Sequence, residues 1–194
     1  MASRDDVYLK FGVTAEAAQL LETSLGTLLL GVQGFQKGWH ALPQPEEATA
    51  ALERIEKSTL GALLTKLQEL VTFEGDLPAF FRSALKTRNR LMHGFYERHN
   101  FKIQTDEGRD AMLADLEAMH TELFNAWRVA DAMDSIIVLR LDAMIDYDSW
   151  DDKRLEQIRR SIEKAPLIVA GPELAAFVEK RWPWLAGKLH RIDQ

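Results

Sequence analysis

The sequence predicts an all-α protein, a bundle of four to five helices with a C-terminal helical extension. Apolar residues recur at steps of three or four along most of the chain, which is the helical period. Alternating β-branched runs are scarce, and the hairpin dipeptides Asn-Gly and Asp-Gly do not occur. The 194 residues are 46% apolar, which is enough for a core that needs no covalent or metal cross-links.

The first helix is expected to begin at Thr14 as its N-cap and to run to about Phe35. Gly26 and Gly31 inside it indicate close approach by other helices, because glycine is otherwise unfavourable in a helix. After a Pro-rich loop, a second helical region covers residues 46–71. Ser58 can act as an N-cap within that region, so the region is either one helix or two.

The third helix is expected after a break at residues 73–78. Asp76 suits its N-cap, and Pro78 suits its first turn. We expect it to end between Gly94 and Arg98, because glycine favours a helix end.

The fourth helix has Thr105 as its predicted N-cap and an apolar stripe that continues to Ile145. A straight helix of that length would be about 60 Å long, which is more than a small domain needs. We therefore expect a kink, a break or a partner chain beside it. Composition shifts after Tyr147, which predicts two parts: a helical bundle over residues 1–147, and a helical extension over residues 148–194 packed on the bundle.

Charge and composition exclude several classes of protein. The net charge of −6 argues against a protein that coats nucleic acid through bulk charge, but leaves room for a local basic patch. Without cysteine there is no disulfide framework and no thiolate metal site. No signal-peptide core and no membrane-spanning run is visible. We therefore expect a cytoplasmic protein with no membrane contact, no cofactor and no metal.

The third helix carries an arginine where an apolar residue is expected. On a helical wheel Arg88 falls in the middle of an apolar stripe, and burying a guanidinium there is costly unless it is paired. Arg82, Lys86, Arg90 and His93 lie together on another face. The stripe consists of Leu77, Phe81, Ala84, Leu85, Met92 and Phe95.

A basic patch surrounds this arginine. The range from Arg82 to Lys102 holds six lysines and arginines and one acid, Glu97. Aromatic residues lie among these charges, and flat rings can stack on unpaired bases. Guanidinium groups can fork onto phosphates. The candidate RNA-binding residues are Arg82, Lys86, Arg90, Tyr96, Arg98 and Lys102.

Arg88 and His93 together suit RNA cleavage without a metal. An imidazole can take the proton of a ribose 2'-OH or protonate the leaving oxygen, because it titrates near neutral pH. A guanidinium can stabilise the charge that develops on the phosphate.

The hexapeptide RNRLMH, from Arg88 to His93, resembles the R-X4-6-H motif of the HEPN superfamily (higher eukaryotes and prokaryotes nucleotide-binding). The resemblance implies a small helical bundle that cleaves RNA without a metal, with Arg88 and His93 as catalytic pair and Asn89 as the polar motif residue. It also implies a homodimer whose two motifs line one cleft, and a toxin or anti-phage effector silenced by an antitoxin or regulatory protein. Many toxin members carry tyrosine where this chain has Phe95, with Tyr96 one residue later.

Other readings remain open at this point. The chain is alternatively a non-catalytic HEPN-like module that binds RNA, nucleotide or protein, or a purely structural helical dimer. Arg88 can be a structural residue paired with an acid of another helix, and His93 a helix-terminus residue favoured by the dipole. His99 is expected in a loop, and His120 at the border of the fourth helix's apolar stripe.

Overall fold

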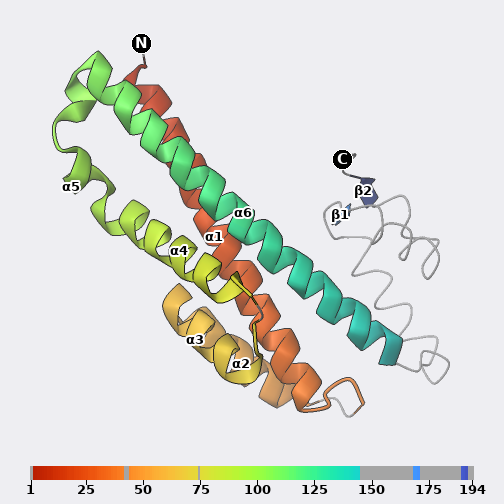
Figure 1. Ribbon diagram of the computed structural model, residues 1–194. Helices are drawn as coiled ribbons and strands as arrows, with labels where there is room; N and C mark the ends of the chain where they lie inside the picture. The colour runs from red at the N-terminus through yellow and green to blue at the C-terminus, as the bar shows by residue number, and fades with distance from the viewer. Residues whose placement is uncertain (1, 42–43, 74, 145–167, 171–188, 192–194) are drawn as a thin grey trace. The chain divides into compact units, whose positions relative to one another are not determined.

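The structure is a computed structural model that describes residues 2–41, 44–73, 75–144, 168–170 and 189–191 (Figure 1). The chain divides into two compact units, Met1–Met144 and Ile145–Gln194. Every element described in the first unit is helical, which confirms the all-α prediction for that unit. None of the described helices is both long and apolar enough to cross a membrane.

Helix α1 (Arg4–Gln36) begins eleven residues earlier than the sequence predicts. Its N-cap is Ser3, whose hydroxyl accepts from the Asp6 backbone N–H at 3.1 Å while the Asp6 carboxylate accepts from the Ser3 N–H at 2.8 Å. This capping box starts the helix, and the prediction of Thr14 as N-cap is wrong. Thr14 is buried within α1, and its hydroxyl donates to the carbonyl of Lys10 at 2.7 Å.

The second helical region is two helices, α2 (Pro45–Glu56) and α3 (Leu60–Leu70). The cap of α3 is Thr59, whose hydroxyl accepts from the Ala62 backbone N–H at 3.3 Å. The Ser58 hydroxyl instead donates to a carbonyl one turn back, so the predicted cap is displaced by one residue.

Helix α4 (Leu77–Asn89) continues into a π-helical turn (Arg90–Gly94) and then into α5 (Phe95–His99). We call these three elements together the motif rod. Asp76 occupies the N-cap position and Pro78 lies in the first turn, as predicted, although the Asp76 carboxylate makes no capping hydrogen bond. The motif rod ends at His99, one residue beyond the predicted range for its end, Gly94 to Arg98.

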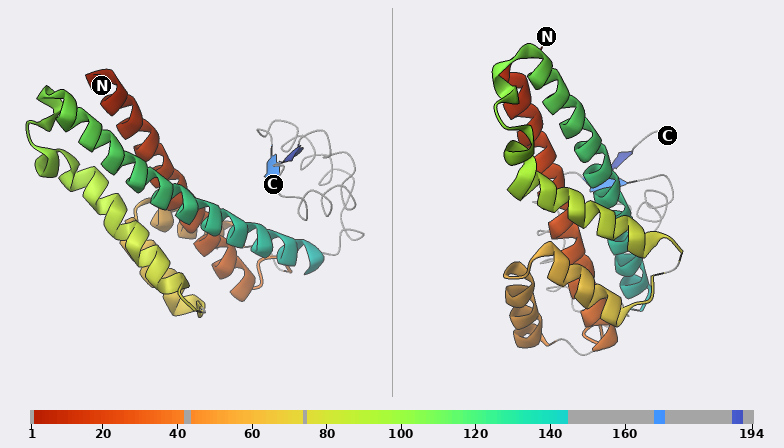
Figure 2. Two further views of the ribbon diagram at one scale, coloured as in Figure 1. Left: turned by 45° about the horizontal axis from the view of Figure 1, so that its top comes forward. Right: turned by 60° about the vertical axis from the view of Figure 1, so that its left-hand side comes forward.

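Helix α6 (Asp106–Met144) follows a single 3₁₀ turn (Lys102–Gln104). Its N-cap is Thr105, as predicted, whose hydroxyl accepts from the Gly108 backbone N–H at 3.1 Å. The helix is one uninterrupted element of 39 residues, so the expected break is absent. Its neighbour along this length is α1 of the same chain (Figure 2).

Two glycines let other helices approach α1 closely, as the sequence predicts. A Cβ at Gly26 would lie 2.9 Å from the Ile55 side chain of α2, and a Cβ at Gly31 would lie 3.1 Å from the Ile137 side chain of α6. A methyl group at Gly26 would therefore displace the Ile55 side chain, and one at Gly31 would require a small shift of Ile137.

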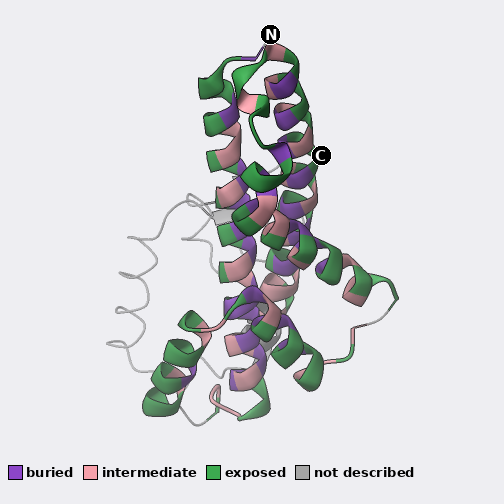
Figure 3. Cartoon of the chain, turned by 90° about the vertical axis from the view of Figure 1, so that its left-hand side faces the viewer, coloured by how far each residue is buried: buried purple, intermediate pink, exposed green. Residues whose placement is uncertain are grey.

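The core lies between α1, α3, the motif rod and α6, where the buried residues face inward (Figure 3). If the motif rod is counted as one, the described part of the first unit has five helical rods, within the predicted four to five. The largest fully buried side chains are Phe81, Phe95, Leu21, Leu25, Leu28, Leu60, Leu67, Leu91, Met112, Leu116, Met119 and Leu123.

The described residues of the second unit are two short strands, β1 (Ile168–Ala170) and β2 (Leu189–Arg191). They pair in parallel, with Ile168 opposite Leu189. A helical extension was predicted there, and at these positions that prediction is wrong. Ile168 and Val169 are β-branched, which suits a strand. The rest of the predicted extension lies outside the described residues, and its packing on the bundle stays a prediction.

Candidate functional site

The predicted motif lies across the junction of α4 and the π turn. Arg88 and Asn89 are the last two residues of α4, and His93 lies within the π turn. In an uninterrupted α-helix, residues five apart point about 140° from each other. The i→i+5 bonds of a π turn add about one residue to the turn, which brings such residues nearer to the same side. Single π turns inside α-helices occur frequently at functional sites.

The π turn also changes which residues are buried. Leu91 is 1% exposed, whereas Met92, which the wheel places in the apolar stripe, is 43% exposed. The wider turn shifts the register after Asn89, because it uses one more residue than an α-turn. Phe95 returns to the core beyond it.

Arg88 has an acidic partner on another helix. Its side chain is 20% exposed, and its Nη2 lies 3.2 Å from Oε2 of Glu22 on α1. Its Nη1 donates to Oδ1 of Asn89 at 3.3 Å. The pairing that an arginine in an apolar stripe requires is therefore present, as the structural reading of this residue expects.

His93 is exposed to solvent. Within the part of the chain that the structure describes, its imidazole has no hydrogen bond or ion pair. Apolar side chains do not enclose it, so a ligand can reach the ring. The side chain of Arg88 is thus held by Glu22 and Asn89, whereas the side chain of His93 is exposed to solvent.

An acid on α6 contacts both the first residue of the π turn and the last residue of α5. Asp115 Oδ1 lies 3.0 Å from Arg90 Nη2, and Asp115 Oδ2 lies 2.8 Å from His99 Nε2. His99 was predicted in a loop, but it is buried at the end of α5, with its ring centroid 4.7 Å from that of Phe95. That prediction is wrong, because the motif rod continues one turn past Gly94.

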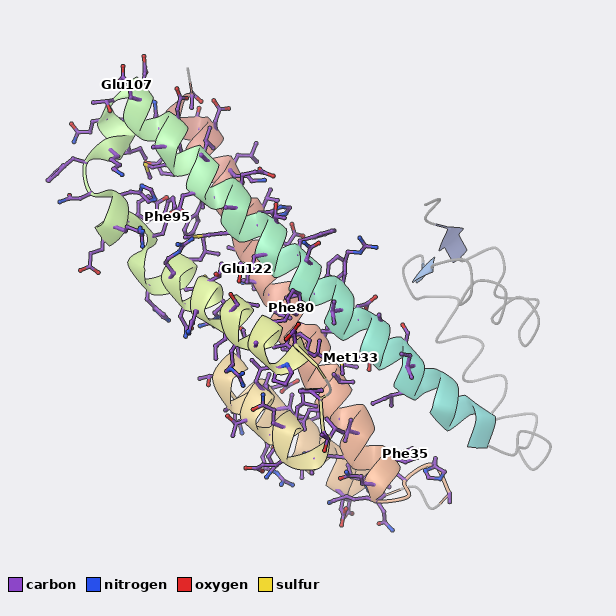
Figure 4. The ribbon with its side chains drawn as sticks, viewed as in Figure 1. Phe35, Phe80, Phe95, Glu107, Glu122 and Met133 are labelled. Atoms are coloured by element: carbon purple, nitrogen blue, oxygen red, sulfur yellow. The ribbon has the colours of Figure 1, made fainter. Side chains whose placement is uncertain are left out.

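A second acid on α6 holds α4. The carboxylate of Glu122 accepts from the hydroxyls of Ser83 at 2.5 Å and Thr87 at 2.6 Å, in the space between α6 and α4 (Figure 4). Together with Arg90 and Asp115, these contacts show that the motif rod runs antiparallel to α6. Asp115 and Glu122 are seven residues apart and directly precede the buried Leu116 and Leu123. That spacing was the signal by which the sequence could have identified them.

The structure divides the five cations among the candidate RNA-binding residues into two groups. Arg82, Lys86, Arg98 and Lys102 are exposed and have no ion pair with any described acid. Arg90 is half-buried against Asp115 rather than on the open basic face.

Tyr96 is 44% exposed, and its ring packs against that of Phe11 with 5.4 Å between the ring centroids. Burial, with a smaller effect from Tyr8, raises the pKa of its hydroxyl. Of the other histidines, His120 is half-buried beside the stripe of α6, as predicted. Among the described residues, no cluster of three or more histidines and acids has the arrangement of a metal site.

Comparisons of this chain with protein-family models, with curated proteins and with solved structures find no match. The resemblance to HEPN proteins thus depends on the hexapeptide from Arg88 to His93 and on the helical pattern around it.

Proposed function

We propose that the protein is a metal-independent endoribonuclease of HEPN type, with a composite active site across a homodimer. The observation that carries the proposal is the position of the motif: His93 is open to solvent in a π turn, and Arg88 is held at the end of the preceding helix. The role we propose is that of a toxin or defence effector silenced by an antitoxin or other regulatory protein.

The proposed reaction is internal transfer at an RNA phosphodiester. The ribose 2'-oxygen attacks phosphorus and loses its proton to one His93 imidazole, while the bond from phosphorus to the 5'-oxygen breaks. The leaving oxygen takes a proton from the His93 of the other protomer, acting as general acid. Arg88 stabilises the extra negative charge on the phosphate oxygens. The products are a 2',3'-cyclic phosphate and a 5'-OH.

The donors of Arg88 support this role. A guanidinium has five N–H donors, and the contacts with Glu22 and Asn89 use two of them. Glu22 also restricts the rotamers of Arg88, which lowers the entropy lost when a phosphate binds. The exposed cations Arg82 and Lys86 precede Arg88 on α4 and supply attraction for the RNA backbone.

The ion pair itself favours a second candidate, a non-catalytic module that binds RNA, nucleotide or protein. Glu22 offsets the charge of Arg88, and Asp115 offsets that of Arg90. In such a module Arg88 would be a packing residue, and His93 one contact among several.

RNA cleavage in EDTA separates the two candidates. The wild type is compared with Arg88→Ala and His93→Ala on unpaired and structured RNA, and solution mass is measured in parallel. We expect each variant to lose about 100-fold or more of the cleavage rate, the range for a general acid–base group such as His93 and for a charge-stabilising donor such as Arg88. Arg54→Ala on α2 and His120→Ala on α6 are matched controls that should cleave normally. Equal cleavage by the wild type and both motif variants would rule out the nuclease as the function of this protein.

A further inference from the structure

Phe101 has an unusual backbone and an unusual exposure. It lies between α5 and the 3₁₀ turn with φ of 40°, in the left-handed region of backbone conformation. Its side chain is 75% exposed, the highest value among the exposed large apolar residues described. A bulky residue in the left-handed region costs free energy, and such strain concentrates at functional sites.

Hydrogen bonds hold the turn in which Phe101 lies. The Phe101 carbonyl accepts from the Gln104 N–H at 2.9 Å, and Arg109 Nη1 donates to the Ile103 carbonyl at 3.0 Å. The Lys102 carbonyl lies so near Gly108 that a Cβ there would clash. Phe101 is thus held outward by a fixed turn.

The ring of Phe101 has no partner within the described part of the chain. No described aromatic ring stacks on it, and the hydrophobic core does not include it. Two exposed cations, Arg98 and Lys102, flank it in the sequence. An exposed ring without an aromatic partner, with exposed cations close by in the sequence, has the components of sites that bind single-stranded nucleic acid, where bases stack on aromatics and cations contact the backbone.

We propose that Phe101 is a stacking platform for an unpaired base, with Arg98 and Lys102 on the adjoining phosphates. This inference rests on the proposed RNA substrate and narrows it to unpaired RNA. Duplex RNA keeps its bases stacked on each other and offers no base face to the ring. Tyr96 is less suited to this task, because Phe11 and Phe95 already pack against its ring.

Binding to RNA tests the platform separately from cleavage. All proteins carry His93→Ala, so that the RNA stays intact, and fluorescence anisotropy measures affinity for a labelled unpaired RNA and its duplex. Phe101→Asn should weaken binding to unpaired RNA about 10-fold, within the range for loss of a stacking aromatic. Phe101→Tyr should retain the affinity of the parent. Phe35→Ala is the matched control, because Phe35 is an exposed aromatic residue at the C-terminal end of α1, and it should also retain the affinity of the parent.

Stability and mass complete the test. Asparagine tolerates the left-handed region, so Phe101→Asn should not lower the urea midpoint of unfolding. Unchanged RNA affinity in Phe101→Asn would overturn the platform, and a lower solution mass with unchanged affinity would assign the ring to a protein contact instead. Binding that depends on Phe101 in a protein that does not cleave RNA would retain the platform and reject the nuclease.

Discussion

The two acidic pairs of α6 have different surroundings. In its first half, Asp115 and Glu122 each accept from two side chains of the motif rod. Further along, Asp131 and Asp134 have no donor among the described residues. Burial raises the pKa of both, and with the neighbouring charge of Asp131 it raises that of Asp134 to about 6. The first pair cross-links two elements, whereas the second pair is a cost to the fold.

Of these four carboxylates, the two that accept hydrogen bonds from another described element are those that contact the motif rod. Asp115 and Glu122 hold the helix on which Arg88 and His93 lie, and Glu22 holds it from α1. The motif rod is thus attached by carboxylates on two helices, α1 and α6, in addition to its apolar side. Such attachment suits a site whose groups must keep fixed positions.

The largest expected effect comes from the register of the motif rod. Leu91→Ala should lower the free energy of unfolding by about 3 kcal/mol, because Leu91 is fully buried. Met92→Ala should cost less than about 1 kcal/mol, because Met92 is exposed. Urea unfolding followed by circular dichroism measures both. An uninterrupted α-helix, with Met92 in its apolar stripe, would give the reverse order.

The two acidic pairs can be compared directly. Asp115→Ala leaves the half-buried Arg90 and the buried His99 without their partner, and should lower the free energy of unfolding by about 2 kcal/mol. Asp131→Ala, on the same helix, should be neutral or stabilising. Urea midpoints at pH 7 measure both, and equal losses would abolish the distinction between the two pairs.

A pH dependence should distinguish the second pair. The unfolded pKa of Asp134 is near 3.8 and its folded pKa is about 6, so its burial destabilises the charged form and stability falls as pH rises between these values. Asp134→Asn should therefore raise the free energy of unfolding by about 1 kcal/mol at pH 8, a value reduced for partial solvation, and give no gain below pH 4. A gain that is equal at both pH values would contradict the assigned cause.

The smallest effect is expected for Glu22→Gln. The Arg88–Glu22 pair is partly open to solvent, so its loss should lower the free energy of unfolding by about 0.5 kcal/mol. Thermal unfolding compared with Glu16→Gln, an exposed acid of α1, measures the difference. A loss of several kcal/mol would make Arg88 primarily a structural residue.

Local signals in the sequence predicted much of the fold. The steps of three and four gave the helices, and Thr105 and Pro78 marked two of their starts. Ser3 with Asp6 was an equally local signal and was missed in favour of Thr14. The strand at Ile168 was missed because a short apolar run has no clear period.

The candidate site was less predictable, since it depends on contacts between distant segments. The hexapeptide identified Arg88 and His93. The helical wheel indicated that Arg88 needs a charged partner, but no pattern in the sequence indicated that this partner is Glu22. The π turn has no sequence period of its own, so the exposure of Met92 and the pairing of Arg90 were missed.

The proposed composite active site is tested most directly by mixing wild-type and inactive protomers. The proposed reaction needs the His93 of both protomers, so a mixed dimer of wild type and His93→Ala, which has only one His93, should cleave RNA as slowly as the His93→Ala dimer. An excess of His93→Ala, once native mass spectrometry shows that the wild-type protomers are in mixed dimers, should therefore suppress cleavage, whereas the same excess of His120→Ala should not. Mixed dimers of wild type and His93→Ala that cleave as fast per wild-type protomer as the wild-type dimer would contradict the account.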